Sequence, residues 1–269
     1  MGTRLVGRVA EVVTLDRLRA AAGAAVFLVG EAGIGKTAVV EEAVARALAA
    51  GATVLTGRAE PDEGAPAYWP WLRLLESAPA GLSVDLLDAG DMPSAAAARF
   101  SVAQRTVRAL HRAGPLVLVL EDLHWADAAS IALLRSLCAE ITGTSILVIG
   151  TVRLPDDRFP LGDLAGLPGV EVLPLGPLEV PAVGAYLIQQ AGEPVHPSWA
   201  AVVHRLGGGN PLYVRELARL LARDRRLRRP ATDVDLPDGL RRLVHTRTAQ
   251  LSDPCTSRSG PRRWARSPC

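Results

Sequence analysis

The sequence predicts an α/β protein, in which a doubly wound parallel sheet of five strands is followed by a small helical lid. Two observations predict this fold class. Through residues 1–176, short apolar segments alternate with segments of helical periodicity, which is typical of a parallel sheet with helices on both faces. After Gly176-Pro177, apolar residues recur only at helical spacing, which indicates a separate group of helices.

The first half of the sheet is expected around a glycine-rich loop. Residues 25–29 are an apolar run and predict the first strand. Apolar residues then recur at helical spacing through residues 40–48, so a helix should follow the loop. Residues 53–56 predict the second strand. The proline- and aromatic-rich residues 61–71 predict an irregular excursion.

The remaining strands are expected between residues 94 and 173. Residues 94–112 predict an amphipathic helix. Its apolar face should carry four residues, Phe100, Ala103, Val107 and Leu110. Residues 116–120 are wholly apolar, as in a strand buried on both faces, and the helix at 131–138 precedes two further strands, at 146–153 and 170–173.

The rest of the chain divides into two parts. Apolar residues at helical spacing, the last of them Leu240 and Val244, predict a lid over residues 177–251. Residues 252–269 are rich in arginine, serine and proline and show no apolar periodicity, so a disordered tail outside the folded domains is expected.

The composition argues against several classes of protein. The net charge of +2 does not by itself indicate nucleic-acid binding. The arginines of residues 223–229 lie at a predicted helix end, where cations are favoured, and no helix-turn-helix spacing follows them, so no DNA-binding module is expected. No apolar run is long enough to cross a bilayer, and Cys138, Cys255 and Cys269 suggest neither disulfides nor a metal site. A cytoplasmic location is expected.

The glycine-rich loop is the strongest functional signal. Lys36 is the only lysine among the 30 basic residues. It belongs to the run Gly30-Glu31-Ala32-Gly33-Ile34-Gly35-Lys36-Thr37. In this pattern backbone N–H groups cradle phosphates, the lysine reaches the outer phosphates and the hydroxyl meets Mg²⁺. The pattern predicts nucleotide binding; the alternative is a glycine turn with an exposed lysine.

Two acids follow the strand expected at residues 116–120. Glu121 and Asp122 would lie at its carboxyl end, where a Mg²⁺ ion held by Thr37 and phosphates needs a nearby carboxylate. A solvated strand end is the alternative for such a pair.

Residues 116–127 resemble the second acidic motif of STAND-type ATPases within the AAA superfamily, such as the N-terminal modules of large LuxR-type regulators. Three further segments carry the same resemblance, in order along the chain. They are Leu5-Val6-Gly7-Arg8 with Glu11, Gly150-Thr151-Val152-Arg153, and Gly207 to Leu217 with its Gly-Asn-Pro sequence. The resemblance covers residues 5–251 and implies a P-loop NTPase fold.

The resemblance also implies roles for individual residues. Val6, Gly7 and Arg8 would line the adenine end of the site, with Pro211 capping the base from the lid. Glu121 falls on the metal-coordinating acid, which is usually aspartate in this motif, and Asp122 on the water-polarising acid. Arg153 would sense the γ-phosphate; the alternative is an arginine solvated at a strand end.

Other conspicuous side chains have structural explanations. His124 and Trp125 beside a buried strand are expected to be packing residues. Asp127 precedes a helix and is expected to be its N-cap. The cluster of residues 68–71 could form a binding surface or anchor a long loop, and these alternatives stay open.

The function expected from all these features is that of an ATP-binding, Mg²⁺-dependent regulatory ATPase, a switch module of a LuxR-type transcriptional regulator with slow hydrolysis. One alternative is a nucleotide-binding scaffold without meaningful turnover. Another is an inactive fragment of a longer regulator, truncated or frameshifted near residue 251. The expected partners are ATP or ADP, with self-association or downstream effector domains in a full-length parent and no membrane contact.

Overall fold

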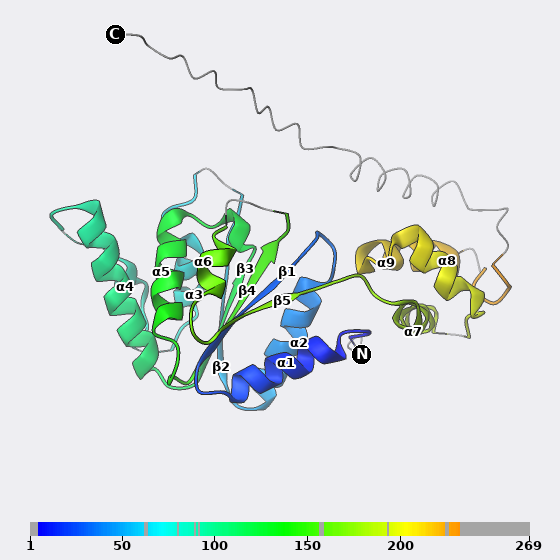
Figure 1. The fold of residues 1–269 in the computed structure, drawn as a ribbon, viewed down its shortest axis with the longest axis horizontal. Helices are drawn as coiled ribbons and strands as arrows, with labels where there is room; N and C mark the ends of the chain where they lie inside the picture. Colours follow the sequence, from blue (N-terminus) through cyan, green and yellow to red (C-terminus); the bar gives the residue numbers. More distant parts are fainter. Residues whose placement is uncertain are drawn as a thin grey trace, which may run out of the picture.

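The computed structural model describes residues 5–61, 64–79, 81–88, 90, 92–155, 159–192, 194–223 and 226–231. Five parallel strands form one sheet in the order β2-β3-β4-β1-β5 (Figure 1). The strands are β1 (Ala24–Gly30), β2 (Thr53–Arg58), β3 (Leu116–Glu121), β4 (Ile146–Arg153) and β5 (Val170–Pro174). The predicted α/β class and parallel sheet are confirmed.

Strand register decides which residues reach the carboxyl edge of the sheet. Gly30 lies opposite Arg153 across the β1–β4 pair, and Arg58 lies opposite Glu121 across the β2–β3 pair. Because the strands are parallel, their carboxyl ends meet at one edge, where open α/β sheets bind ligands. The register therefore gathers the residues that follow β1, β2, β3 and β4.

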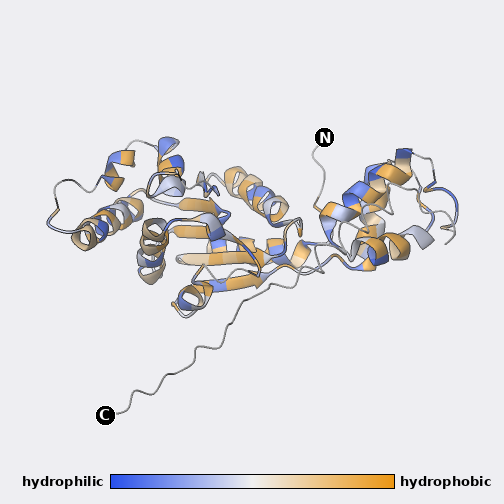
Figure 2. Cartoon of the chain, turned by 90° about the horizontal axis from the view of Figure 1, so that it is seen from above, coloured by the Kyte–Doolittle hydropathy of each residue, from blue (hydrophilic) through white to orange (hydrophobic). Residues whose placement is uncertain are grey.

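Helices cover both faces of the sheet, as a doubly wound fold requires (Figure 1). Buried side chains of α1 (Val9–Ala20) and α2 (Lys36–Ala49) form a core on one face. Those of α3 (Trp69–Glu76), α4 (Ala95–Arg112) and α5 (Ala128–Ala139) form a larger core on the other. Shorter elements complete this domain: η1 (Val84–Leu87), η2 (Leu123–Trp125) and α6 (Leu161–Ala165). Figure 2 shows the apolar strands enclosed between these layers.

Three helices form a second group beside the carboxyl edge of the sheet (Figures 1 and 2). They are α7 (Val180–Ala191), α8 (Ser198–Gly207) and α9 (Pro211–Arg223), which share their own apolar core. Leu175 N–H still bonds to the sheet, at the carbonyl of Val29 (2.8 Å), whereas Leu178 N–H already bonds to Gly209 of the helical group (2.8 Å). Only two residues lie between these anchors. The expected helix at Leu240 and Val244 and the tail 252–269 lie outside the described residues.

Helix α3 corrects the expectation of an irregular segment through residue 71. The helix begins at Trp69, with Pro70 in its first turn, where a missing N–H costs no hydrogen bond. Trp71 is 1% exposed, and its indole N–H donates to the carbonyl of Ser130 at 3.1 Å. Trp71 is therefore a core residue. Helices α1 and α6 were likewise not predicted.

Helix α4 has the predicted bounds to within one residue, but its predicted apolar face is partly wrong. Phe100 is 70% exposed. The buried residues are Val102, Thr106, Val107 and Leu110. At 100° per residue, Phe100 lies about a quarter of a turn from the middle of this buried stripe. A face that runs through Val102 and Thr106 therefore leaves Phe100 at its border.

This difference predicts opposite outcomes for two truncations on one helix. Leu110→Ala should lower the free energy of unfolding by about 2–5 kcal/mol, because it leaves a cavity in the core. Phe100→Ala, one of the largest truncations possible by volume, should change it by less than about 1 kcal/mol. Urea denaturation of both variants measures the contrast, and equal losses would contradict the assigned face.

Two further properties concern the described residues alone. None of their helices is both long enough and apolar enough to cross a membrane. Cys138 is fully buried in α5, and burial raises the pKa of its thiol to about 12. This cysteine is therefore an inert core residue.

Candidate functional site

The loop between β1 and α2 has a backbone that only glycine adopts easily. Gly33 and Gly35 have φ angles of +74° and +97°, in the left-handed region that side chains disfavour. Space is restricted as well, because a Cβ added to Gly33 would lie 2.6 Å from the Cβ of Leu212 in α9. The glycines are thus required both by the turn and by the lid that contacts it.

All five carbonyl groups from Gly30 to Ile34 accept hydrogen bonds. Lys36 Nζ donates to Gly30 (2.8 Å) and to Glu31 (2.9 Å). The donors to the other three carbonyls are Asn210 Nδ2 to Ala32 (3.0 Å), Leu212 N–H to Gly33 (3.2 Å) and Arg8 Nη2 to Ile34 (2.9 Å). Besides Lys36 of the loop itself, these donors come from Arg8, in the opening segment (residues 5–8), and from the lid.

Several N–H groups of the loop are left for another partner. Within the described part of the chain, the N–H groups of Gly33 and Gly35 have no acceptor. The first-turn N–H groups of α2 also lack intrahelical partners, as at every helix start. Free N–H groups at a helix N-terminus suit an anion such as phosphate. The loop geometry thus fits the predicted ligand.

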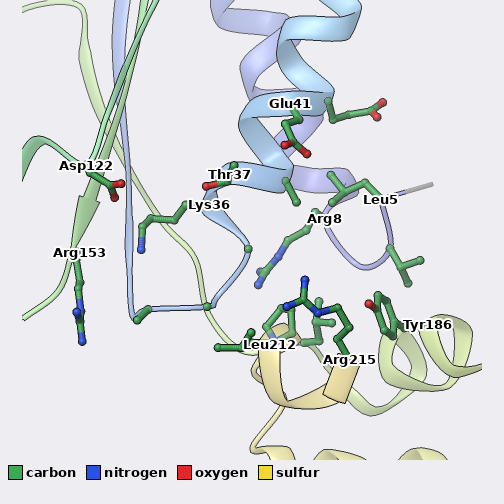
Figure 3. Close-up of a pocket in the computed structure, with 18 of the residues that line it drawn as sticks. Leu5, Arg8, Lys36, Thr37, Glu41, Asp122, Arg153, Tyr186, Leu212 and Arg215 are labelled. Carbon is green, nitrogen blue, oxygen red and sulfur yellow. The ribbon is translucent and has the colours of Figure 1, made fainter. Parts of the chain in front are cut away.

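Burial lowers the pKa of Lys36. The negative charge of Asp122 raises this pKa by less than burial lowers it, and the positive charge of Arg153 lowers it further. An anionic phosphate would favour the charged form of this lysine. Figure 3 shows the side chains of Lys36, Asp122 and Arg153 on the same side of the site.

Glu121 is the last residue of β3 and lies beside the start of α2. Its Oε2 atom accepts a hydrogen bond from the hydroxyl of Thr37 at 3.4 Å. Burial raises the pKa of this carboxyl, and the charge of Arg58 opposes that effect. The hydroxyl and the carboxylate predicted to hold a metal are therefore neighbours.

Asp122 leaves the sheet in a left-handed conformation, with φ of +55°, which aspartate tolerates better than most residues. Its backbone N–H donates to Thr151 Oγ1 (2.9 Å). Arg58 contacts its carboxylate twice, with Nη2 at 2.6 Å and Nε at 2.9 Å. Arg58 carries no motif, so the sequence analysis missed it; the only available signal was a cation at the carboxyl end of a strand.

β4 and η2 also contribute to this end of the site. The backbone N–H of Arg153 donates to Nδ1 of His124 at 3.4 Å. The ring of His124 also lies against that of Trp125, with centroids 5.1 Å apart. His124 is buried and Trp125 is 38% exposed, and both line the same cleft as Arg153. They pack as expected and also reach the site.

Asp127, in contrast, has the structural role that was predicted. Its Oδ1 atom accepts hydrogen bonds from the N–H groups of Ala129 and Ser130, both at 3.0 Å. Its Oδ2 atom accepts from Tyr68 N–H at 3.2 Å. Asp127 is the N-cap of α5 and also anchors the residue that precedes α3.

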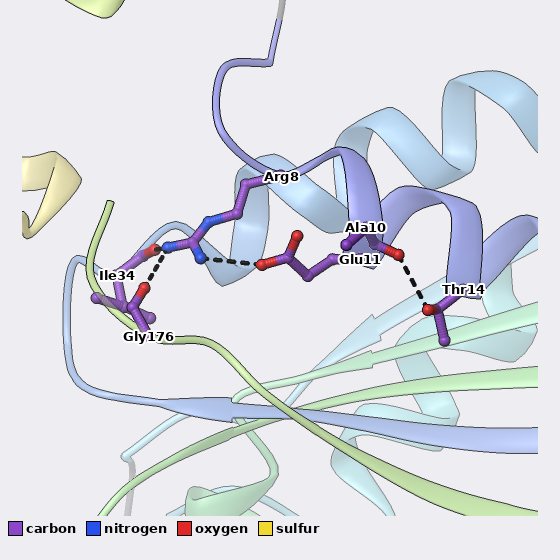
Figure 4. A network of polar contacts seen from close by, with 6 residues as sticks. All are labelled: Arg8, Ala10, Glu11, Thr14, Ile34 and Gly176. Atoms are coloured by element: carbon purple, nitrogen blue, oxygen red, sulfur yellow. Dashed lines mark hydrogen bonds and ion pairs between the residues drawn. The ribbon is translucent and has the colours of Figure 1, made fainter. Parts of the chain in front are cut away.

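The other end of the site is formed by the opening segment and the lid. Arg8 is 5% exposed, and its guanidinium joins three segments (Figure 4). It donates to Glu11 (3.0 Å), to the carbonyl of Ile34 (2.9 Å) and to the carbonyl of Gly176 (2.6 Å). Gly7, with φ of +70°, lies against the lid, since an added Cβ would be 2.6 Å from that of Ala182.

One cleft of about 700 Å³ joins both ends of the site (Figure 3). Ten predicted site residues line it: Val6, Arg8, Ala32, Gly33, Gly35, Lys36, Thr37, Asp122, Arg153 and Pro211. Five others do not line it: Gly7, Gly30, Glu31, Ile34 and Glu121. These five belong to the segment that contacts the lid, to the end of β1 and its loop, and to the end of β3. Tyr186 and Arg215 of the lid line the cleft and were not predicted.

A parallel sheet with a glycine loop after β1 and paired acids after β3 is the arrangement of a P-loop NTPase. The sequence profile of the AAA ATPase domain family matches residues 4–149. The chain therefore belongs to this family and contains an AAA-type P-loop module. No curated protein sequence matches the chain significantly.

Solved structures with the same fold are distant in sequence. A STAND protein with a tetratricopeptide repeat sensor from Pyrococcus horikoshii has a TM-score of 0.57 and 20% identity over 90% of this chain and 32% of its own. A Walker-type ATPase of Pyrococcus abyssi has a TM-score of 0.56 and 12% identity, over 93% of this chain and 75% of its own. The Orc1 protein of Aeropyrum pernix, solved with DNA, has a TM-score of 0.53 and 19% identity, over 93% of this chain and 66% of its own. The chain thus spans about a third of the STAND protein, and at these identities the likeness shows the fold alone.

Proposed function

We propose that this protein is an ATP-binding, Mg²⁺-dependent regulatory ATPase module, in which the bound nucleotide sets how α7–α9 pack against the sheet. The observation that carries the proposal is the continuous cleft, in which the loop, Asp122, Arg153 and Pro211 face one space. Ligands that contact both the sheet and the lid shift the equilibrium between lid positions.

The phosphates would be bound by the loop and its lysine. The free N–H groups of Gly33 and Gly35 and the start of α2 supply oriented donors. Lys36 would exchange its contacts with the carbonyls of Gly30 and Glu31 for phosphate oxygens, a stronger charge-assisted interaction.

Thr37 and Glu121 would hold the Mg²⁺ ion, and Asp122 would reach it directly or through water. Hydroxyl and carboxylate oxygens are ligands that Mg²⁺ accepts, and the 3.4 Å contact between Thr37 and Glu121 brings the two together. The described residues contain no group of three His, Cys, Asp or Glu side chains able to hold a metal alone. The site therefore suits an ion whose coordination is completed by phosphate oxygens and water. When bound, the ion would neutralise the charge that develops on the phosphates.

Hydrolysis would use two further side chains. Asp122 would orient the attacking water, and the guanidinium of Arg153 would stabilise charge on the transferred phosphoryl group. We propose that turnover is slow, because Asp122 is engaged by Arg58. At the other end, Val6, Gly7 and Arg8 would shape the adenine subsite, with Pro211 over the base.

A nucleotide-holding scaffold without meaningful turnover is the second candidate. Glutamate at the metal position and the Arg58–Asp122 pair both favour it. Phosphate release from pure protein under multiple-turnover conditions, with Mg²⁺ and with excess EDTA, separates the two. Sustained Mg²⁺-dependent release supports the ATPase; tight ATP binding with less than one turnover supports the scaffold; no ATP binding contradicts both.

We further propose that the module works within a larger cytoplasmic signalling protein of the LuxR regulator type. The length of the STAND protein, of which this chain spans 32%, supports a modular setting. In this arrangement residues 1–176 are the ATPase core, residues 177–251 the lid and residues 252–269 lie outside both. Effector domains or a second copy would respond to the lid.

A further inference from the structure

Asn210 precedes α9 and connects the lid to the glycine loop. It is 5% exposed, and its amide has a partner on each side. Nδ2 donates to the carbonyl of Ala32 in the loop at 3.0 Å. Oδ1 accepts from the N–H of Leu212 at the start of α9, also at 3.0 Å. One side chain thus holds the two segments together.

The neighbouring contacts strengthen this connection. Leu212 N–H also reaches the carbonyl of Gly33 at 3.2 Å, and the side chain of Leu212 fills the space above Gly33. The lid therefore contacts two consecutive carbonyls of the loop. A lid that moves away would break both contacts together.

Because of the geometry of the peptide bond, these contacts to carbonyls also fix the direction of N–H groups in the loop. The carbonyl of one residue and the N–H of the next belong to one planar unit and point in opposite directions. The carbonyl of Ala32 therefore shares a plane with the N–H of Gly33, and the carbonyl of Ile34 with the N–H of Gly35. Neither of these two N–H groups has an acceptor in the described structure. Asn210 fixes the first plane and Arg8 the second.

We propose that Asn210 is a positioning residue that aims the N–H of Gly33 at the phosphates and so makes nucleotide affinity depend on the docked lid. This inference rests on the proposed nucleotide binding and deepens it. The rival explanation is that Asn210 only caps α9, through its contact with Leu212 N–H.

The variant Asn210→Ser separates the two roles. Serine is a good helix cap and uncharged, but it is too short to reach the Ala32 carbonyl. Positioning predicts that affinity for ATP and for ADP falls at least about tenfold, the effect of one lost hydrogen bond. Capping alone predicts affinity within twofold of the unmodified protein. The control is Arg219→Ala, an exposed change on the same helix, which should leave the affinity unchanged.

Hydrogen exchange of the unmodified protein gives a second test that needs no variant. On addition of ATP, peptides covering residues 31–37 and residues 209–214 should gain protection together. Protection of the loop alone, or an Asn210→Ser variant that binds normally, would overturn the inference. Failure of the unmodified protein to bind ATP at all would instead contradict the proposed function.

Discussion

Lys36→Ala should weaken ATP binding by at least about a hundredfold, the effect of losing charge-assisted contacts to phosphate. The variant removes the cation that would leave the carbonyls of Gly30 and Glu31 to bind the phosphate oxygens. Titration calorimetry with ATP and Mg²⁺ measures the loss.

Arg46→Ala is the matched control for this variant. Arg46 lies on the same helix, forms ion pairs with Glu42 and Asp16, and does not line the cleft. Its removal should leave the ATP affinity within about twofold of the unmodified protein, since exposed ion pairs contribute little to stability. If Lys36→Ala bound ATP as tightly as this control, the assignment of a phosphate-binding loop would be wrong.

Asp122→Asn should lower the rate of ATP hydrolysis by about 10²- to 10³-fold while the affinity for ATP stays within about threefold. Asparagine has nearly the same shape and tolerates the left-handed backbone at this position. It loses the negative charge, which would orient the water and which pairs with Arg58. Single-turnover phosphate release, together with a binding titration, separates the chemical step from binding.

Stability does not confound this variant. Asp122 loses its ion pair with Arg58, but both side chains are partly exposed, so the loss should cost less than about 1 kcal/mol. Asp163→Asn, an exposed change on α6 outside the cleft, is the control and should hydrolyse ATP normally. An Asp122→Asn protein that turned over ATP at the unmodified rate would exclude water activation by this carboxylate.

The sheet could be predicted because its central strands are buried on both faces. The apolar residues 116–120 lie in β3, and the strand predicted at residues 146–153 has the bounds of β4. The missed helices lack such a signal. In α1, the exposed apolar residues Val9 and Val13 interrupt the helical pattern of the buried ones, which are Val12, Leu15 and Leu18. In α3, Pro70 resembles a helix breaker, although a proline is tolerated in the first turn of a helix.

The site could be predicted where its chemistry is local in sequence. The glycine loop and the acids after β3 are short runs whose residue types reveal their chemistry. Arg58 approaches Asp122 only because β2 lies next to β3. Asn210 meets Ala32 only because the lid docks on the loop. Contacts of this kind depend on strand order and helix packing, which no local pattern specifies.

The two-residue connection between sheet and lid restricts how the helices can travel. Leu175 is bonded to β1 and Leu178 to Gly209. Between them, Pro177 has a fixed φ, whereas an added Cβ at Gly176 would meet no atom within 4 Å, and the carbonyl of Gly176 is held by Arg8. If the Arg8 contact were released, the three helices would turn about this short connection. With its 13 residues, α9 is about 20 Å long, so a turn of about ten degrees would carry its far end about 3 Å. Small rearrangements around a phosphate would thus be enlarged into a displacement that another protein surface could detect.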